Sequence, residues 1–398
     1  MLEFYSKLGY SSCHNMDKKP KILVAMSGGV DSSVAAALLV RAGFDVTGMF
    51  AVNYDEPRAD GESCWHGDYE DALRVCAKLG IKLLRWNFVK EYRRDVLNYM
   101  YREYSAGRTP NPDVLCNKFV KFGAWLKRAK KEGFDYLATG HYARLTPRIS
   151  NFKFSNCRLA AGISKQFQNS NFQLIQAKDN NKDQTYFLHQ LSQDQLKHAL
   201  FPIGEYTKSA VRALAKKFKL PTAEKEESMG ICFVGEVPMR KFLEKKIKPR
   251  PGETLLSDGT IIGKHDGLPF YTIGERKAIK SKPYFVVDKN LKNNQLIVGL
   301  ENDPRMFKKE IIVKNIHWIS DYAPKLPLKC QFRLRHRQDL QKGVISKDPI
   351  PNTLKLRADS PQRAVTPGQF AVLYSARRSP KGAKAGKNGD CLGGGVIL

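Results

Sequence analysis

A loop of small and hydroxyl-bearing residues, SGGVDSS at positions 27–33, follows a short apolar run, KILVAM at positions 21–26. The adjacent glycines let the backbone turn tightly and direct its N–H groups at an anion. A helical pattern follows, which would direct the positive end of a helix dipole to the same point. No Gly-Lys-Ser/Thr follows, so this is not a Walker loop. We interpret it as a phosphate-binding loop; the structural alternative is a tight turn in which Asp31 or Ser32 caps the helix.

Two cysteines lie in segments that could support thiol chemistry. Cys116 lies in GRTPNPDVLCNK, residues 107–118, where two prolines fix a rigid entry. If a helix begins there, Asp113 and Cys116 share one face, and Lys118 beside a thiol near the helix N-terminus favours the thiolate. Cys232 lies in ESMGICFVGE, residues 227–236. Taken alone, each segment is more simply interpreted as a buried structural cysteine in a tight turn.

The remaining histidine and cysteine signals are weaker. His141 closes a run that reads as a buried strand, where a histidine is more often structural, so we leave it out of the site. None of the eight cysteines forms a Cys-x-x-Cys pair, which argues against a structural zinc site and a disulfide scaffold. We predict no metal site and interpret four cysteines as packing residues: Cys64, Cys76, Cys157 and Cys330.

The charge balance indicates a polyanionic partner. The chain has 398 residues, of which 42% are hydrophobic and 27% charged, as in a soluble globular protein of two or three domains. Lysine and arginine number 67 against 39 acidic residues, a net charge of +28. We expect nucleic acid as the partner, with an anionic membrane surface as the weaker alternative. No apolar run approaches the ~20 residues of a membrane span, so we predict no membrane segment.

The elements that must position these residues alternate between strand-like and helical patterns. Strands are expected at 21–26, 46–52, 82–88 and 135–139, and helices after the glycine-rich loop and at 68–79, 89–104 and 118–131. This alternation predicts an α/β, Rossmann-like parallel sheet with right-handed crossovers. Residues 147–173 lack a period and predict a surface insertion. Beyond Pro249, short alternating runs separated by Gly, Pro and Asn predict a β-barrel or sandwich.

Several motifs together resemble a known family. SGGVDSS resembles the PP-loop of the ATP pyrophosphatases, which have an adenine-nucleotide α-hydrolase-like fold and cleave ATP between its α and β phosphates. The tRNA-specific 2-thiouridylases carry similar motifs in the same order. In this chain they are GRTPNPDVLCNK, ATGHYAR at 138–144, KDQTYFL at 182–188, GICFVGE at 230–236 and TPGQ at 366–369. The resemblance extends over nearly the whole chain from residue 21.

The resemblance implies a role for each matching residue. Cys116 would be the nucleophile, Cys232 the persulfide carrier and Asp113 a third catalytic residue. Residues implied to form the ATP pocket are Ala25, Met26, Ser27, Gly28, Gly29, Val30, Asp31, Ser32, Ala51 and Gly140. Residues implied to contact the target base are Asn111, Pro112 and Asp113, and those implied to contact tRNA elsewhere are Lys182, Asp183, Gln184, Arg335 and His336.

The implied reaction replaces the C2 oxygen of the wobble uridine in tRNA with sulfur. ATP would adenylate the oxygen, with Mg²⁺ screening the phosphates. The implied partners are tRNA and an upstream persulfide donor, either a cysteine desulfurase or a relay protein. Thiol exchange would leave a Cys116–Cys232 disulfide for a reductant to reopen. The alternatives are a PP-loop ligase or amidotransferase acting on a small molecule, and a tRNA-binding protein without catalysis.

We expect four regions along the chain. They are an N-terminal extension at 1–20, the PP-loop ATP-binding catalytic domain at 21–200, a small central domain at 201–250 and a C-terminal β-barrel that contacts tRNA at 251–398. The basic balance and the phrases CNKFVKFG and ESMGICFVGE resemble mitochondrial members of the family. A mitochondrial location is therefore expected, with the cytoplasm as the alternative.

Overall fold

The computed structural model describes residues 19–57, 61–147, 171–226, 232, 234, 238–279, 282–376 and 389–398. The expected N-terminal extension and the expected insertion at 147–173 lie almost entirely outside the described residues. Within the described ranges, no helix is both long enough and apolar enough to cross a membrane.

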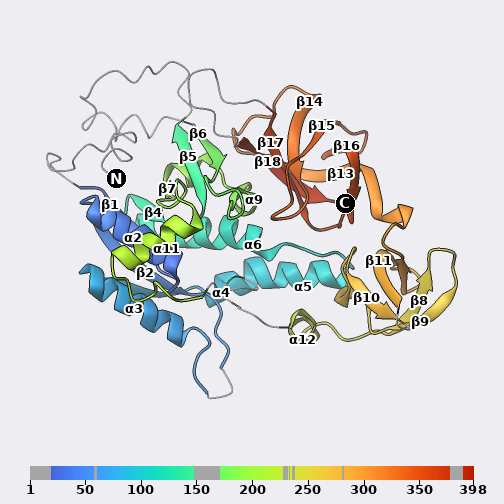
Figure 1. Cartoon of the computed structure of the whole chain (residues 1–398), viewed down its shortest axis with the longest axis horizontal. Helices are drawn as coiled ribbons and strands as arrows, with labels where there is room; N and C mark the ends of the chain where they lie inside the picture. Colours follow the sequence, from blue (N-terminus) through green and yellow to red (C-terminus); the bar gives the residue numbers. More distant parts are fainter. Residues whose placement is uncertain are drawn as a thin grey trace.

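A five-stranded parallel sheet forms the centre of the N-terminal part, in the order β3-β2-β1-β4-β7 (Figure 1). Its central strand β1 is buried on both faces, with Leu23 in one apolar layer and Ile22 and Val24 in the other. This confirms the predicted α/β parallel sheet. The strands are β1 (Lys21–Ala25), β2 (Asp45–Val52), β3 (Leu83–Asn87), β4 (Tyr136–Ala138) and β7 (Ala199–Leu200).

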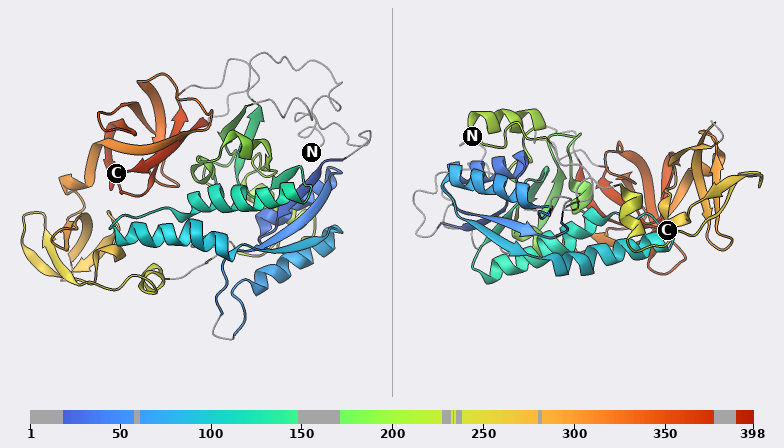
Figure 2. Two further views of the ribbon diagram at one scale, coloured as in Figure 1. Left: turned by 180° about the vertical axis from the view of Figure 1, so that it is seen from behind. Right: turned by 90° about the horizontal axis from the view of Figure 1, so that it is seen from below.

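Helices cover both faces of this sheet. One layer contains α2 (Val30–Arg41), α3 (His66–Leu79) and α11 (Lys208–Lys217). The other contains two long helical runs that lie side by side in both figures (Figure 2). The first run is α4 (Val89–Tyr92), η2 (Arg93–Leu97) and α5 (Asn98–Ser105), and the second is α6 (Pro112–Leu115), η3 (Cys116–Trp125) and α7 (Leu126–Lys131).

The second run begins earlier than the helix expected at 118–131. Pro112 occupies its first turn, and the Asn111 side chain caps it by accepting a hydrogen bond from the Val114 N–H at 3.4 Å. Both η2 and η3 are π-helical, so their backbone bonds are of the wider i→i+5 type. The structure therefore places Cys116 inside a helical run, at the start of its π-helical part.

The C-terminal region expected as one β-barrel contains two sheets. The first has the order β10-β11-β12-β8-β9. In the second, strands β13-β16-β15-β14-β17-β18 close into a barrel because β13 also pairs with β18. The strands are β8 (Gly252–Leu256), β9 (Ile261–His265), β10 (Arg276–Ile279), β11 (Lys282–Asn290), β12 (Gln295–Gly299), β13 (Phe307–Trp318), β14 (Leu328–Arg333), β15 (Gln341–Lys347), β16 (Thr353–Arg363), β17 (Phe370–Ser375) and β18 (Asp390–Ile397).

The N-terminal part also contributes strands to the sheet of the barrel. β5 (Ala143–Pro147) and β6 (Phe172–Gln176) pair with each other, and β6 pairs with β18. The sequence patterns had predicted neither strand, because both border the aperiodic segment at 147–173. The short helices are α9 (Thr185–Leu188), α10 (Gln193–Lys197), α12 (Met239–Glu244), η4 (Leu268–Phe270) and η5 (Pro304–Met306).

Candidate active site

The glycine-rich loop joins β1 to α2, as the sequence predicted. Gly28 has φ +73°, and a Cβ there would collide with the main-chain oxygen of Asp68. A Cβ at Gly140 would lie 2.7 Å from the Ser32 nitrogen, so the second loop also approaches the start of α2 closely. Gly29 is the N-cap of α2 and no side chain caps it, so the alternative role of Asp31 or Ser32 as the cap is wrong. The loop leaves backbone N–H groups at a helix N-terminus for an anion.

Two lysines from distant parts of the chain reach acidic residues around this loop. Lys208 Nζ lies 2.8 and 2.9 Å from the two carboxylate oxygens of Asp31. Lys225 Nζ lies 2.6 Å from Asp68 Oδ1, in the helix that packs beside Gly28. Sequence reasoning missed both lysines because neither lies in a motif. They neutralise carboxylates that would otherwise repel an anion at the loop.

A cavity of about 450 Å³ extends from this loop to the cysteine segments. Its volume is in the usual range for small-molecule sites. The predicted residues that line it are Ala25, Met26, Ser27, Asp31, Ser32, Ala51, Asp113, Gly140, Gln184 and Cys232. The structure thus brings the expected nucleotide loop and the expected persulfide carrier into one cavity.

The two predicted catalytic cysteines meet, although they are 116 positions apart in the sequence. Their thiols are within hydrogen-bonding reach, and neither forms a disulfide in the structure. The Cys232 N–H donates to Asp113 Oδ1 at 3.2 Å, and the Tyr92 hydroxyl donates to the Cys232 carbonyl at 2.7 Å. Cys116 is fully buried, whereas Cys232 is partly exposed and lines the cavity.

The surroundings shift the pKa values of the two thiols in opposite directions. Burial and the nearby Cys232 sulfur raise the pKa of Cys116 well above its ordinary value. The hydrogen bond from Cys116, together with the Lys121 ammonium, lowers the pKa of Cys232 despite burial. Burial raises the pKa of Asp113. Cys232 is therefore the thiol that more readily becomes an anion.

The structure changes the interpretation of four residues around the thiols and the cavity. Lys118 does not face the thiols; its Nζ donates to Gln190 Oε1 at 3.1 Å. The cation beside the thiols is Lys121, which no motif argument had singled out. His141 and Cys64, interpreted as structural or packing residues, both line the cavity.

The barrel holds the segment that precedes Cys116. Gln369 Nε2 donates to the carbonyls of Thr109 and Pro110 at 2.9 and 3.2 Å. The Asn111 Nδ2 donates to Gln369 Oε1 at 3.4 Å, and the Thr109 N–H donates to the Pro367 carbonyl at 2.9 Å. Two motifs that lie far apart in the sequence thus form one contact.

The residues expected to contact tRNA occupy different environments. Arg335 is exposed, and half-buried His336 packs on Phe187 with ring centroids 4.4 Å apart. Gln184 lines the cavity and accepts the Tyr142 N–H at 2.8 Å, whereas Lys182 lies outside the cavity wall.

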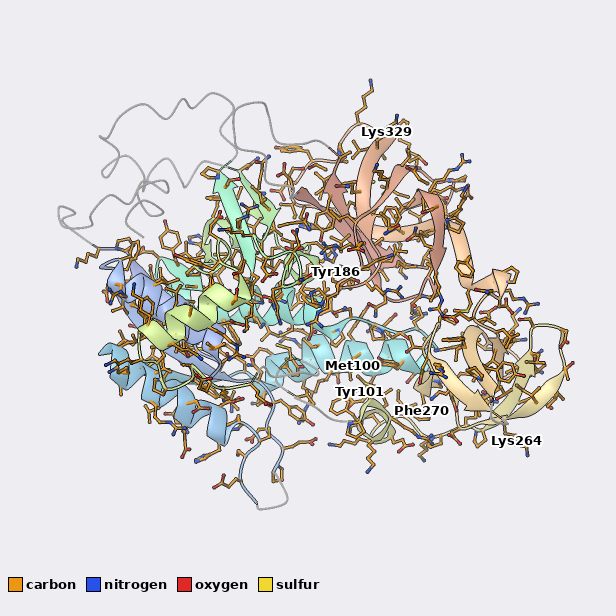
Figure 3. All side chains as sticks on the ribbon, in the orientation of Figure 1. Met100, Tyr101, Tyr186, Lys264, Phe270 and Lys329 are labelled. Atoms are coloured by element: carbon orange, nitrogen blue, oxygen red, sulfur yellow. The ribbon has the colours of Figure 1, made fainter. Side chains whose placement is uncertain are left out.

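The Asp183 carboxylate belongs to the junction between the N-terminal part and the barrel. It is fully buried and accepts bonds from Ala177 N–H and from Arg333 Nη1, each at 3.0 Å. This corrects the expected RNA contact of its side chain, because an enclosed, paired carboxylate cannot reach a nucleic acid. Tyr186, labelled in Figure 3, lies at the same junction and donates to the Phe370 carbonyl at 3.1 Å.

Comparison with known proteins agrees with this architecture. Three family models match successive segments: a tRNA methyl transferase HUP domain at 20–236, a tRNA methyl transferase PRC-barrel domain at 240–300 and an aminomethyltransferase β-barrel domain at 308–397. These ranges contain the parallel sheet, the five-stranded sheet and the closed barrel, respectively. The fold and the site thus define a HUP-domain protein with two appended β domains.

Relatives with this arrangement match almost end to end. Proteins named tRNA-specific 2-thiouridylase MnmA from Bacillus cytotoxicus and Alkaliphilus oremlandii are 41% and 43% identical over 391 and 387 residues. The matches cover 96% of this chain in both cases, and 96% and 97% of those relatives. The Bacillus anthracis protein of the same name is 41% identical over 393 residues and is covered completely. The chain belongs to the tRNA-specific 2-thiouridylase family.

Proposed function

We propose that this protein is an ATP-dependent sulfurtransferase that replaces O2 of the wobble uridine in tRNA with sulfur. The observation that carries the proposal is the meeting of Cys116 and Cys232 at a cavity that the glycine-rich loop also lines. A cavity with only the loop would suit many ATP-using ligases. The paired thiols add a sulfur-transfer function that such ligases do not need.

The first half of the reaction activates a poor leaving group. Uridine O2 attacks the α phosphorus of ATP, the bond to the β phosphate breaks, and pyrophosphate leaves with the electron pair. The loop residues Ser27, Gly28 and Gly29 and the start of α2 would bind the released group. Lys208 pairs with Asp31, which lines the cavity, and so neutralises a carboxylate that would repel the phosphates.

A magnesium ion would supply screening of the phosphate charges. Among the described residues, no group of three or more His, Cys, Asp or Glu side chains could hold a metal ion. The ion would enter bound to the ATP phosphates. Asp31 and Asp68, which both line the cavity, would lie near that complex.

The second half uses the two thiols in order. An upstream persulfide donor, such as a cysteine desulfurase or a relay protein, passes a sulfur atom to Cys232. The Cys116 sulfur then attacks the Cys232 sulfur while the Cys116 thiol gives its proton to the outer sulfur. The bond between Cys232 and the outer sulfur breaks, and its electron pair stays on the outer sulfur. That sulfur replaces AMP at C2, either while leaving Cys232 or after release as hydrosulfide. A Cys116–Cys232 disulfide remains, which a thiol reductant reopens.

RNA contacts are assigned to residues near the cavity. Asn111, Pro112 and Asp113 would contact the target base, and Gln184 lines the same cavity. Lys182, Arg335 and His336 would contact the tRNA outside it, supported by the net charge of +28. A mitochondrial location stays a prediction, and the bacterial relatives do not add support for it.

A labelling experiment with two single variants tests this order of events. Cys232→Ser should bind ATP and tRNA but accept no labelled sulfur from a persulfide donor. Cys116→Ser should accept the label on Cys232 yet fail to transfer it to tRNA. Each variant exchanges one sulfur for oxygen, and a melting curve checks that the fold is intact. Stable label on Cys116 in Cys232→Ser, or near-normal thiolation by Cys116→Ser, would contradict the assigned roles.

A further inference from the structure

The π-helical geometry of η3 brings Lys121 to the face of Cys116. In an α-helix with 3.6 residues per turn, a side chain five positions on points away from the first. In a π-helix the i→i+5 bonds place it roughly above the first residue. Cys116 begins η3, and Lys121 is the fifth residue after it. The unusual helix thus turns a lysine toward the thiols.

The Lys121 side chain is oriented by groups that line the same cavity. Its Nζ lies 3.5 Å from His141 Nε2, and His141 Nδ1 lies 2.7 Å from Thr139 Oγ1. Burial and the nearby Lys121 ammonium hold the pKa of His141 well below its usual range, so the imidazole is neutral. A neutral ring can accept from Lys121 at Nε2 and donate to Thr139 at Nδ1.

The Lys121 ammonium also hydrogen-bonds the Cys232 sulfur. Four described residues act on that sulfur: Tyr92, Asp113, Cys116 and Lys121. The first three carry a hydroxyl, a carboxyl and a thiol, so they are neutral or negative. Lys121 is the cation of this set, and His141 behind it is neutral.

We propose that Lys121 is a positioning residue that holds the Cys232 sulfur as an anion, pointing at Cys116 and the cavity, with His141 fixing its direction. This inference rests on the proposed function, because it explains why Cys232 and not Cys116 would receive and carry the transferred sulfur. A cation within about 4–6 Å of a thiol favours the thiolate. The reactive form of a cysteine is the thiolate, so Lys121 would determine which cysteine reacts.

Alkylation of the full-length protein by iodoacetamide, without ATP or tRNA, tests this directly. After tryptic digestion, residues 226–240 contain only Cys232 and residues 109–118 contain only Cys116, so each rate is read separately by mass spectrometry. In the unaltered protein Cys232 should react faster. Lys121→Met should slow its alkylation at neutral pH by about tenfold and raise the pH of half-maximal reaction. Lys121→Arg, which keeps the charge, should largely restore both.

Lys118→Met is the matched control. It removes a positive charge from the same helix, but its Nζ is directed at Gln190, so Cys232 alkylation should not change. Unchanged Cys232 titration in a folded Lys121→Met protein would overturn the proposal, as would an equal effect of Lys118→Met. If Lys121→Met does not fold, Lys121→Gln gives the same reading. The assay involves no sulfur transfer, so a failure here is distinct from a failure of the cysteine labelling experiment.

Discussion

Replacing Arg333 with methionine tests the junction between the N-terminal part and the barrel. Arg333 Nη1 lies 3.0 Å from Asp183 Oδ2, and their side chains are 7% and 0% exposed. Methionine keeps much of the apolar stem, but it removes the guanidinium, whose Cζ lies 5.5 Å from the Tyr374 ring centroid, and leaves the Asp183 carboxylate buried without its cation. Removing one partner of a buried pair costs about 3–5 kcal/mol. The remaining bonds from Ala177 N–H and Thr185 Oγ1 partly stabilise the charge, so we expect the lower half of that range.

Urea unfolding followed by tryptophan fluorescence measures this loss. Adding Asp183→Asn removes the stranded charge, so the double variant should be more stable than the sum of the two single losses predicts. The control is Lys216→Met, which breaks a 3.0 Å pair with Glu224 whose side chains are 59% and 80% exposed. That change should cost less than about 1 kcal/mol. If the free energy of unfolding of Arg333→Met is within about 0.5 kcal/mol of that of the unaltered protein, the buried pair does not stabilise the junction.

Two further predictions concern the glycine-rich loop and a buried histidine. Gly29 has an extended backbone, and the atom nearest to a Cβ added there would be Ser27 Oγ at 3.4 Å. Gly29→Val should therefore keep a near-normal melting temperature but abolish pyrophosphate release. Normal release would contradict the phosphate-binding role. Burial lowers the pKa of His189 to about 3. The unfolded chain binds this proton near pH ~6.5, so stability should fall as pH drops from there toward 3. His189→Gln should flatten that fall between pH 7.5 and 5 in urea titrations, and an equally steep fall would contradict it.

Local patterns were sufficient for the parallel sheet and the glycine-rich loop. The run around Leu23 is apolar at successive positions because β1 is covered on both faces, and this pattern is readable without a structure. The start of the second helical run was misplaced because propensity does not show that Asn111 caps it and Pro112 occupies its first turn. Strands β5 and β6 were missed because they border the aperiodic segment at 147–173, and β6 pairs with β18, more than 200 residues further along.

The cation at the thiols shows a different limit of sequence reasoning. The sequence argument favoured Lys118 as the thiolate partner because it lies only two positions after Cys116. The π-helical η3 instead directs Lys121 there, and an unusual backbone of this kind leaves no clear signal in residue types. The meeting of Cys116 with Cys232 came from the family resemblance, since neither segment alone indicates the other.

The contact between Gln369 and the segment before Cys116 has a consequence for how a substrate would be selected. Gln369 immediately precedes β17 of the barrel. The hydrogen bonds from its side-chain amide fix Thr109 and Pro110 relative to that strand. If the barrel binds one part of an RNA, the fold fixes the distance between that binding surface and the reactive sulfur. The protein would then select a target base by its distance from the part of the RNA that the barrel binds, as well as by the chemistry of the base.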